Sequence, residues 1–200
     1  MESLTFDRSF IGQLTESIAM KNAMAEDSKL VHLVDQISHA CVDTILAGGK
    51  ILIAGNGGSA ADAQHFAGEL VSRFYFDRPG LPGIALTTDT SILSAIGNDY
   101  GYELAFSRQV QALGRPGDLF VGISTSGNSP NILAALDQAR QMQIRTLGMT
   151  GRSGGKMLDR CDWCLRIPSD STPRIQEGHE VVMHAICAFV EQAIFGKSQG

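Results

Sequence analysis

Apolar residues recur at helical spacing near the beginning of the chain. Leu30, Leu33, Ile37 and Cys41 follow one another at steps of three and four residues, which is the spacing of one face of an α-helix. The pattern predicts two amphipathic helices between about residues 9 and 47. A pair of glycines follows directly and is expected to end the second helix, since glycine readily adopts the backbone conformation that closes one.

Beyond residue 49, short apolar runs alternate with segments of helical character. Each run is continuously apolar, which is typical of strands buried on both faces of a parallel sheet. The expected strands are Ile51–Ala54, Gly83–Leu86, Leu119–Ile123, Thr146–Met149 and Trp163–Ile167. The expected helices are Ala60–Phe74, a broken stretch across Thr90–Leu113, Asn131–Met142, a short one near Gly155–Arg160, and Ile175–Phe195.

This alternation predicts the fold class and the domain organisation. Strands joined by helices imply right-handed crossovers and a doubly wound, mainly five-stranded parallel α/β sheet flanked by helices. No internal repeat or linker interrupts the chain, so a single domain is expected over residues 1–200. Within it, the N-terminal helices (1–48) are expected to pack on the sheet or against another subunit. Residues 49–196 are expected to form the α/β core.

Two turns rich in glycine and hydroxyl side chains follow predicted strands. They are Gly55–Ser59 (GNGGS) and Ser124–Ser129 (STSGNS). Ligands of open parallel sheets bind beyond the carboxyl ends of the strands, and a helix N-terminus offers free N–H groups and a positive dipole end. Either turn alone could be an ordinary loop, but the pair favours binding of an anion, phosphate in particular. Ser59 is expected at the N-cap of the helix that follows.

Other phosphate-binding motifs fit the first turn less well. GNGGSA lacks the spacing of the dinucleotide-binding G-x-G-x-x-G motif, and it lacks the Lys-Ser/Thr ending of a P-loop. A third segment, Gly97–Asp99, is expected to break the chain after Ile96. There Asn98 and Asp99 could hydrogen-bond sugar hydroxyls, although Asn-Asp is also common in plain turns.

Polar side chains that could do chemistry lie on two of the predicted helices. They are Asp62, His65 and Glu69 on the first, and Gln176, Glu180 and His184 on the second. Steps of three and four residues place each group on one helical face. Histidine and carboxylate one turn apart can share a metal or a substrate, but such pairs are mostly plain surface pairs. The spacing does not decide whether the second group belongs to a core, an interface or an acid/base site.

Composition narrows the choice of partners and compartment. The net charge of −5 and a charged fraction of 18% give no electrostatic footprint for nucleic acid or an anionic membrane, so an anion must be bound by local groups. The first ten residues lack the basic region and the apolar run of a secretory signal. The four cysteines are consistent with a reduced, cytoplasmic setting. Cys161 and Cys164 form a CxxC ahead of an apolar run, where neither redox nor zinc chemistry is expected.

With these residues in view, the chain resembles the phosphoheptose isomerases, a branch of the sugar isomerase (SIS) domain family. Four segments carry the resemblance: GNGGSAADAQHFAGELVSRF (55–74), RPGLPGIALTTDTSILSAIGNDYGYE (78–103), GISTSGNSPNILAAL (122–136) and RIQEGHEVVMHAICAFVEQAIFG (174–196). It extends over essentially the whole chain and implies a flavodoxin-like SIS fold.

The resemblance also implies an activity. The family converts sedoheptulose 7-phosphate to D-glycero-D-manno-heptose 7-phosphate through an enediolate, the first step of ADP/GDP-heptose biosynthesis for lipopolysaccharide and other surface glycans. It implies Glu69 and His184 as the acid/base pair, and one zinc ion per subunit on His65, Glu69, Gln176 and His184. It implies substrate contacts from Asn56, Gly57, Gly58, Ser59, Glu69, Asn98, Asp99, Ser124, Thr125, Ser126, Ser129 and Gln176. Members are homotetramers with sites at subunit interfaces.

Two other functions remain open at this point. Some SIS proteins of this size are non-catalytic scaffolds that bind the bacterial replication initiator, and close relatives of that kind lack the glutamate that matches Glu69. A sugar-phosphate sensor could use the same turns without turnover. Glu69 therefore favours the enzyme.

Overall fold

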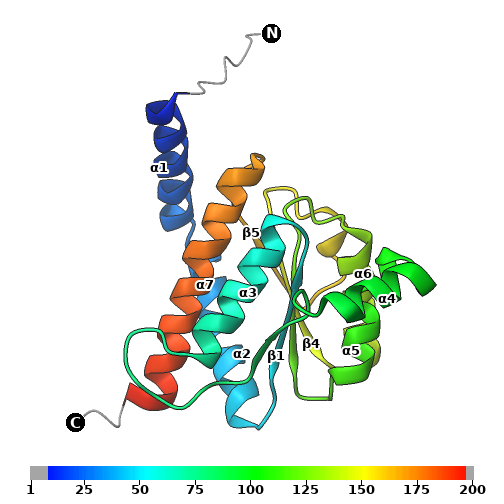
Figure 1. The fold of residues 1–200 in the computed structure, drawn as a ribbon. Helices are drawn as coiled ribbons and strands as arrows, with labels where there is room; N and C mark the ends of the chain where they lie inside the picture. Colours follow the sequence, from blue (N-terminus) through cyan, green and yellow to red (C-terminus); the bar gives the residue numbers. More distant parts are fainter. Residues whose placement is uncertain (1–8, 197–200) are drawn as a thin grey trace.

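The computed structural model describes residues 9–196. A five-stranded sheet lies between two layers of helices, and all of its strand pairs are parallel (Figure 1). The doubly wound α/β class predicted from the sequence is confirmed. Residues 1–8 and 197–200 of the predicted domain lie outside the described part, and so does most of the segment examined for a secretory signal.

The described chain alternates strands and helices in the predicted order. The strands are β1 (Ile51–Gly55), β2 (Gly83–Ala85), β3 (Leu119–Ile123), β4 (Arg145–Thr150) and β5 (Trp163–Arg166). The α-helices are α1 (Phe10–Glu26), α2 (Ser28–Leu46), α3 (Gly58–Val71), α4 (Thr90–Tyr100), α5 (Ser107–Leu113), α6 (Pro130–Gln141) and α7 (Thr172–Phe195). Two short 3₁₀ turns are η1 (Tyr102–Leu104) and η2 (Gly155–Met157).

The strand order fixes where a ligand can bind. The order is β2-β1-β3-β4-β5, which is the flavodoxin-like arrangement. Neighbours β1 and β3 pair in parallel, with Gly55 opposite Ile123 at their carboxyl ends. Their connections leave in opposite directions, so a crevice opens between them at this topological switch point. The two Gly/Ser-rich turns follow these two strands and therefore meet at the crevice.

Each face of the sheet has its own apolar core. On one face, the strands pack against α2, α3 and α7 through residues such as Phe66 and Ile186. On the other face they pack against α5 and α6, where Phe106 and Phe120 are buried. α1 contacts both α2 and α7 and extends beyond the body of the domain (Figure 1). Within residues 9–196, no helix is both long and apolar enough to cross a membrane.

Three local expectations were wrong in detail. The strand β2 is only partly buried, because it lies at the edge of the sheet. α4 continues through Asn98 and Asp99 to Tyr100, and the chain breaks instead at Gly101, whose φ of 88° ends the helix. Gly57 occupies the N-cap of α3, with a φ of 57° that favours glycine, so Ser59 lies inside the first turn.

A buried ion pair anchors the end of α3 to α7. Glu191 accepts hydrogen bonds from the backbone N–H groups of Phe74 (2.8 Å) and Tyr75 (2.7 Å) and from Arg78 Nε (3.1 Å). Arg78 in turn donates to the carbonyl oxygen of Glu69 at 2.8 Å. Side-chain exposure of the pair is only 2% and 1%. The two helices that carry the candidate catalytic residues are thus held together at one end.

Candidate active site

The two turns predicted to bind phosphate lie side by side and are linked by side-chain amides. Asn56 Nδ2 donates to Asn131 Oδ1 at 2.9 Å, and Asn131 Nδ2 donates back to Asn56 Oδ1 at 2.8 Å. The Tyr102 hydroxyl also donates to Asn56 Oδ1, at 3.1 Å. A cavity of about 390 Å³ opens here, lined by Asn56, Tyr102, Glu103, Ser129, Pro130 and Asn131. Asn56, a predicted substrate contact, therefore joins the first turn to the start of α6.

Hydroxyl groups of the second turn converge on one another. The Oγ atoms of Ser124 and Ser129 are 2.8 Å apart, and Ser126 Oγ lies 3.5 Å from Ser124 Oγ. Ser129 is the N-cap of α6, but its side chain makes no capping hydrogen bond to the helix. Gly127 has a φ of 67°, and a Cβ there would lie 2.0 Å from the carbonyl oxygen of Gly154. Glycine is thus required for a tight turn that gathers hydroxyls at a helix N-terminus, an arrangement suited to an anion.

The first turn brings the amino end of α3 against α7. A Cβ at Gly58 would lie 2.2 Å from Gln176 Nε2, so the Gln176 side chain occupies the space beside this glycine. Ser59 is 4% exposed and lies under the turn. Gln176 therefore lies near the proposed phosphate end of the crevice, next to three predicted substrate contacts, at 57–59.

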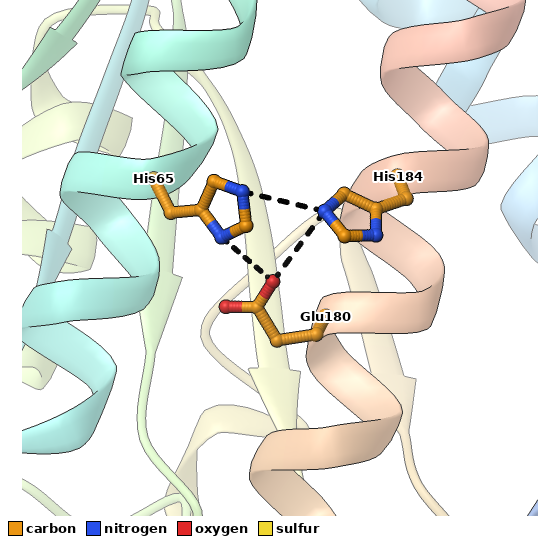
Figure 2. Close-up of side chains that lie close together, drawn as sticks. All are labelled: His65, Glu180 and His184. Atoms are coloured by element: carbon orange, nitrogen blue, oxygen red, sulfur yellow. Dashed lines mark hydrogen bonds and ion pairs between the residues drawn. The ribbon is translucent and has the colours of Figure 1, made fainter.

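A cluster of titratable side chains lies further along the same two helices. His65 on α3 faces Glu180 and His184 on α7 (Figure 2). His65 Nδ1 is 2.9 Å from Glu180 Oε2, and His65 Nε2 is 3.4 Å from His184 Nε2. Glu180 Oε2 is 3.7 Å from His184 Nε2, and Glu69 Oε1 is 3.1 Å from His65 Nε2. The cluster is partly exposed, so a ligand can reach it.

Carboxylates dominate the electrostatics of this cluster. Burial lowers the pKa of His65, but Glu180 and then Glu69 outweigh that effect, and the pKa of His65 is raised above its usual value. The nitrogen and carboxylate atoms of His65, Glu180 and His184 all lie within 4.8 Å of one another. Imidazole nitrogens and carboxylate oxygens are ligands that Zn²⁺ accepts. The cluster is therefore a candidate cation site.

Asp62 adds a buried carboxyl group beneath the cluster. It is 7% exposed, and its Oδ2 has no hydrogen-bond partner among the described residues. Burial, together with the charge and hydrogen bond of Glu180, raises the pKa of Asp62 to about 7. A carboxyl group that is buried beside another carboxyl group ionises less readily, so Asp62 keeps its proton to a higher pH than an ordinary aspartate does. The sequence placed Asp62 on this face but gave no sign that it is buried.

The structure brings together part of the predicted ligand set. His65 contacts both Glu69 and His184, but the three residues whose ligand atoms all lie within 4.8 Å of one another are His65, Glu180 and His184. Glu180 also belongs to the cluster, and sequence reasoning left it out of the ligands although its step of four residues before His184 was visible. Gln176 lies instead beside Gly58.

Two predicted sugar contacts lie apart from this arrangement. Asn98 and Asp99 are exposed on α4, and the Asn98 amide donates to Asp99 Oδ1 at 2.8 Å. Within the described residues, no recorded contact of either side chain reaches the two turns. Their role stays a prediction.

Comparison with known proteins places the chain in a family. The SIS domain family matches residues 17–151, a stretch that includes both turns, His65 and Glu69. A curated relative, phosphoheptose isomerase of Aneurinibacillus thermoaerophilus, is 60% identical over 182 residues, covering 91% of this chain and 92% of the relative.

Solved structures agree with this assignment. Phosphoheptose isomerase GmhA from Neisseria gonorrhoeae superimposes with a TM-score of 0.86 at 44% identity, over 91% of this chain and 96% of that one. A phosphoheptose isomerase from Francisella tularensis gives a TM-score of 0.88 at 38% identity, with coverage of 91% and 96%. The crevice, the hydroxyl-rich turns and these similarities together show that the chain belongs to the SIS domain family.

Proposed function

We propose that the chain is an aldose–ketose isomerase that converts sedoheptulose 7-phosphate to D-glycero-D-manno-heptose 7-phosphate. The observation that carries this is the adjacency of two sites. The hydroxyl-rich turns at the β1/β3 switch point would form an anion cradle at the amino end of α3, and the same helix carries His65 toward Glu180 and His184 on α7. The relative that is 60% identical is named a phosphoheptose isomerase. Such a reaction is the first step of ADP/GDP-heptose biosynthesis.

The phosphate end of the substrate is assigned to the two turns. Hydroxyls of Ser124, Thr125, Ser126 and Ser129, with Ser59 assisting, would surround the phosphate at the positive dipole end of α6. This binding energy would hold the reacting carbons in place, since fixing the reacting groups in one geometry lowers the entropic part of the barrier. Gly57, Gly58 and Gln176 border the path from the phosphate toward the cluster.

The proton transfers are assigned to Glu69 and His184. In the ketose-to-aldose direction, Glu69 would remove a proton from C1, giving an enediolate, and return a proton to C2. His184 would exchange protons with the sugar oxygens, so that the charge on the carbonyl oxygen does not build up. Positioned acid/base groups of this kind contribute about 10²–10⁴-fold to a rate. No atom is gained or lost overall, as an isomerisation requires.

One zinc ion per subunit is part of this proposal, and the contacts of His65 with Glu69 and His184 support it. Ligands about 2.0–2.1 Å from a tetrahedral ion lie roughly 3.3 Å from each other. His65 Nε2 lies 3.4 Å from His184 Nε2 and 3.1 Å from Glu69 Oε1. His65, Glu69 and His184 would hold the ion together with Gln176, whose side chain lies beside Gly58 in this structure. A zinc ion held there would polarise the substrate carbonyl as a Lewis acid.

Glu180 is assigned a positioning role. Its contact is with Nδ1 of His65, whereas Nε2 of His65 faces Glu69 and His184. A carboxylate that accepts a hydrogen bond from one imidazole nitrogen fixes the tautomer and leaves the other nitrogen free to bind a cation. Glu180 would thus orient His65 without touching the substrate.

The assembly is proposed to be a cytoplasmic homotetramer with sites at subunit interfaces, acting on a small sugar phosphate rather than on nucleic acid or membrane. Supporting this, α1 exposes Phe10 (82%), Leu14 (42%) and Ile18 (52%), whose four-residue steps place them on one face of the helix. Light scattering of the purified protein measures its mass directly. A monomer at micromolar concentration would contradict the tetramer.

The activity is tested by incubating the protein with sedoheptulose 7-phosphate and detecting the aldose. Glu69→Gln and His184→Ala should each lower kcat by about 10²-fold or more, with unfolding transitions close to that of the parent. His32→Ala, an exposed histidine on α2, serves as a matched control. Binding of the sugar phosphate without turnover by the parent protein would instead indicate a sensor or scaffold.

A further inference from the structure

Two cysteines lie together at the edge of the sheet opposite β2. Cys161 precedes β5 and Cys164 lies within it, and both side chains pack against the same apolar core, on the face of the sheet covered by α5 and α6. In the β4–β5 register, Cys164 stands opposite Gly148. Both cysteines are only partly buried. β5 is separated from β1 by β3 and β4, so the pair stands apart from the proposed isomerase site.

The neighbouring backbone fixes the position of Cys161 against β4. Cys161 Sγ donates to the carbonyl oxygen of Met157 at 3.0 Å. A Cβ on Gly148 would lie 2.9 Å from Cys161 Sγ, so the absence of a side chain at this position makes room for the sulfur. Thr150 Oγ1 lies 3.9 Å from Cys164 Sγ. Both thiols thus lie against β4, Cys161 at Gly148 and Cys164 at Thr150.

A basic pocket adjoins Cys164. It has a volume of about 300 Å³ and is lined by Asp27, Lys29, Leu30, Leu33, Arg152, Cys164, Arg166 and Pro168. Three of these side chains are cations and one is an anion. Arg152 is paired with Asp170 at 3.0 Å, which leaves Lys29 and Arg166 against Asp27. The pocket therefore keeps a small excess of positive charge in a protein whose overall charge is −5, which suits a small anionic reagent.

The two thiols differ in acidity. The interaction of Cys164 with Cys161 is the largest effect, and it lowers the pKa of Cys164. Thr150 and Arg166 lower it further, so that the pKa falls to about 7 although burial raises it. The interaction with Cys164 and then burial raise the pKa of Cys161. Near neutral pH the proton is therefore on Cys161 and Cys164 carries thiolate character, which is the reactive form.

We propose that Cys161 and Cys164 form a thiol-modification site that reacts with small anionic disulfides, of the oxidised-glutathione class, and closes into an intramolecular disulfide. Cys164 attacks one sulfur of the reagent, which releases one thiolate and leaves a mixed disulfide on Cys164. Cys161 then gives up its proton and attacks the Cys164 sulfur, releasing the second thiol. The protein is oxidised by two electrons, and the reagent is reduced to two thiols.

The remaining cysteines of the chain serve as internal controls. Burial raises the pKa of Cys41 to about 12, and it raises the pKa of Cys187 as well. Both are buried. Neither should react while the protein is folded, because buried thiols of high pKa are inert.

The test is to incubate the full chain with oxidised glutathione at neutral pH and map the products by mass spectrometry. Wild-type protein should gain a Cys161–Cys164 link. Cys161→Ser should stop at one glutathione on Cys164, and Cys164→Ser should slow modification at least about 10-fold, in line with the loss of a thiolate of low pKa. Lys29→Ala should slow the reaction with glutathione disulfide more than that with neutral hydroxyethyl disulfide.

Several results would overturn the proposal. One is the absence of a Cys161–Cys164 link in wild-type protein, a measurement that needs no variant. Others are preferential modification of Cys41 or Cys187, a mixed disulfide that forms on Cys161 ahead of Cys164, and equal effects of Lys29→Ala with both reagents.

Discussion

The carboxylate of Glu180 on α7 lies 2.9 Å from Nδ1 of His65 on α3. This contact joins the two helices of the candidate site and leaves the second ring nitrogen of His65 directed at Glu69 and His184. The orientation of His65 therefore depends on a residue that is neither an assigned acid/base group nor an assigned ligand.

Two replacements of Glu180 should show whether His65 depends on the hydrogen bond to Glu180 or on its negative charge. Glu180→Leu removes the acceptor of His65 Nδ1 and should lower zinc affinity and kcat/KM by about 10- to 100-fold, as is usual when a partner of a ligating histidine is lost. Glu180→Gln keeps an acceptor oxygen and should recover much of the loss. Zinc affinity, measured by competition with a chelator, gives a readout that does not depend on turnover.

The matched control for Glu180 is Glu177→Gln on the same helix. Glu177 pairs with Arg174 at 2.9 Å and does not belong to the His65 cluster. The zinc affinity of the Glu177→Gln variant should stay within about 3-fold of that of the parent protein. Equal losses in Glu177→Gln and Glu180→Leu would show that the effect comes from α7 as a whole and not from His65.

Local signals in the sequence were sufficient for the architecture. Continuous apolar runs such as Leu119–Ile123 predicted buried parallel strands, and these are confirmed. The glycine- and serine-rich turns also depend on short stretches of chain, and the ligand site assigned to them stays a prediction. The pairing of β1 with β3, which brings Asn56 to Asn131, depends on the strand order, which the apolar runs do not specify.

Contacts between segments that lie far apart in the sequence could not be predicted from it. Asp62 and Glu180 are 118 positions apart, and the exposure of each depends on how α3 packs on α7. Glu191 is the clearest case. A glutamate in a helix is expected to face solvent, yet Glu191 is 0% exposed. It is buried with its partner Arg78, which lies in a loop more than a hundred residues earlier in the chain. Sequence periodicity carries no information about such pairs.

Two glycines of α3 offer a paired test of the Gly58–Gln176 contact. Gly58→Ala places a Cβ 2.2 Å from Gln176 Nε2, whereas at Gly68 nothing lies within 4 Å. Because the clash is with the end of a flexible side chain, Gly58→Ala should fold but displace Gln176, and kcat/KM should fall at least about 10-fold, the order expected when a positioning contact is lost.

The Gly68→Ala variant should keep its activity and gain a little stability. Gly68 is exposed in a helix interior, where alanine is favoured over glycine by about 0.5–1 kcal/mol. Thermal unfolding should move slightly upward and activity should be retained. If Gly58→Ala keeps full activity, Gln176 does not contribute from this position.

The Arg78–Glu191 pair should be the more costly of two ion pairs to break. Its side chains are 2% and 1% exposed, whereas those of Arg152 and Asp170 are 60% and 75% exposed. Glu191→Gln leaves Arg78 buried without its counter-charge and should lower the free energy of unfolding by about 3 kcal/mol or more. Asp170→Asn should change it by less than about 1 kcal/mol. Denaturant unfolding at one protein concentration measures both, and equal losses would show that burial does not determine the cost.

His179 should make stability depend on pH in the acidic range. It is 0% exposed, its Nε2 bonds the carbonyl oxygen of Thr150 at 3.1 Å, and burial lowers its pKa from 6.5 to about 4. Between these values the unfolded chain binds a proton that the folded chain does not. The free energy of unfolding therefore falls as the pH drops from 6.5 to 4, by up to about 3 kcal/mol from this group.

Asp62 and Glu191 also change the free energy of unfolding at acidic pH, and they do so in opposite directions. The contribution of His179 is therefore isolated by comparing wild type with His179→Gln. Asp62, whose pKa is raised to about 7, favours the folded state as pH falls. Glu191, whose pKa is lowered by the N–H groups of Phe74 and Tyr75 and by Arg78 against the effect of burial, loses its contribution only below its usual pKa. His179→Gln keeps a donor for Thr150 and cannot titrate. The difference between wild type and variant should therefore change steadily between pH 6.5 and 4, and a constant difference would show that His179 is protonated in the fold.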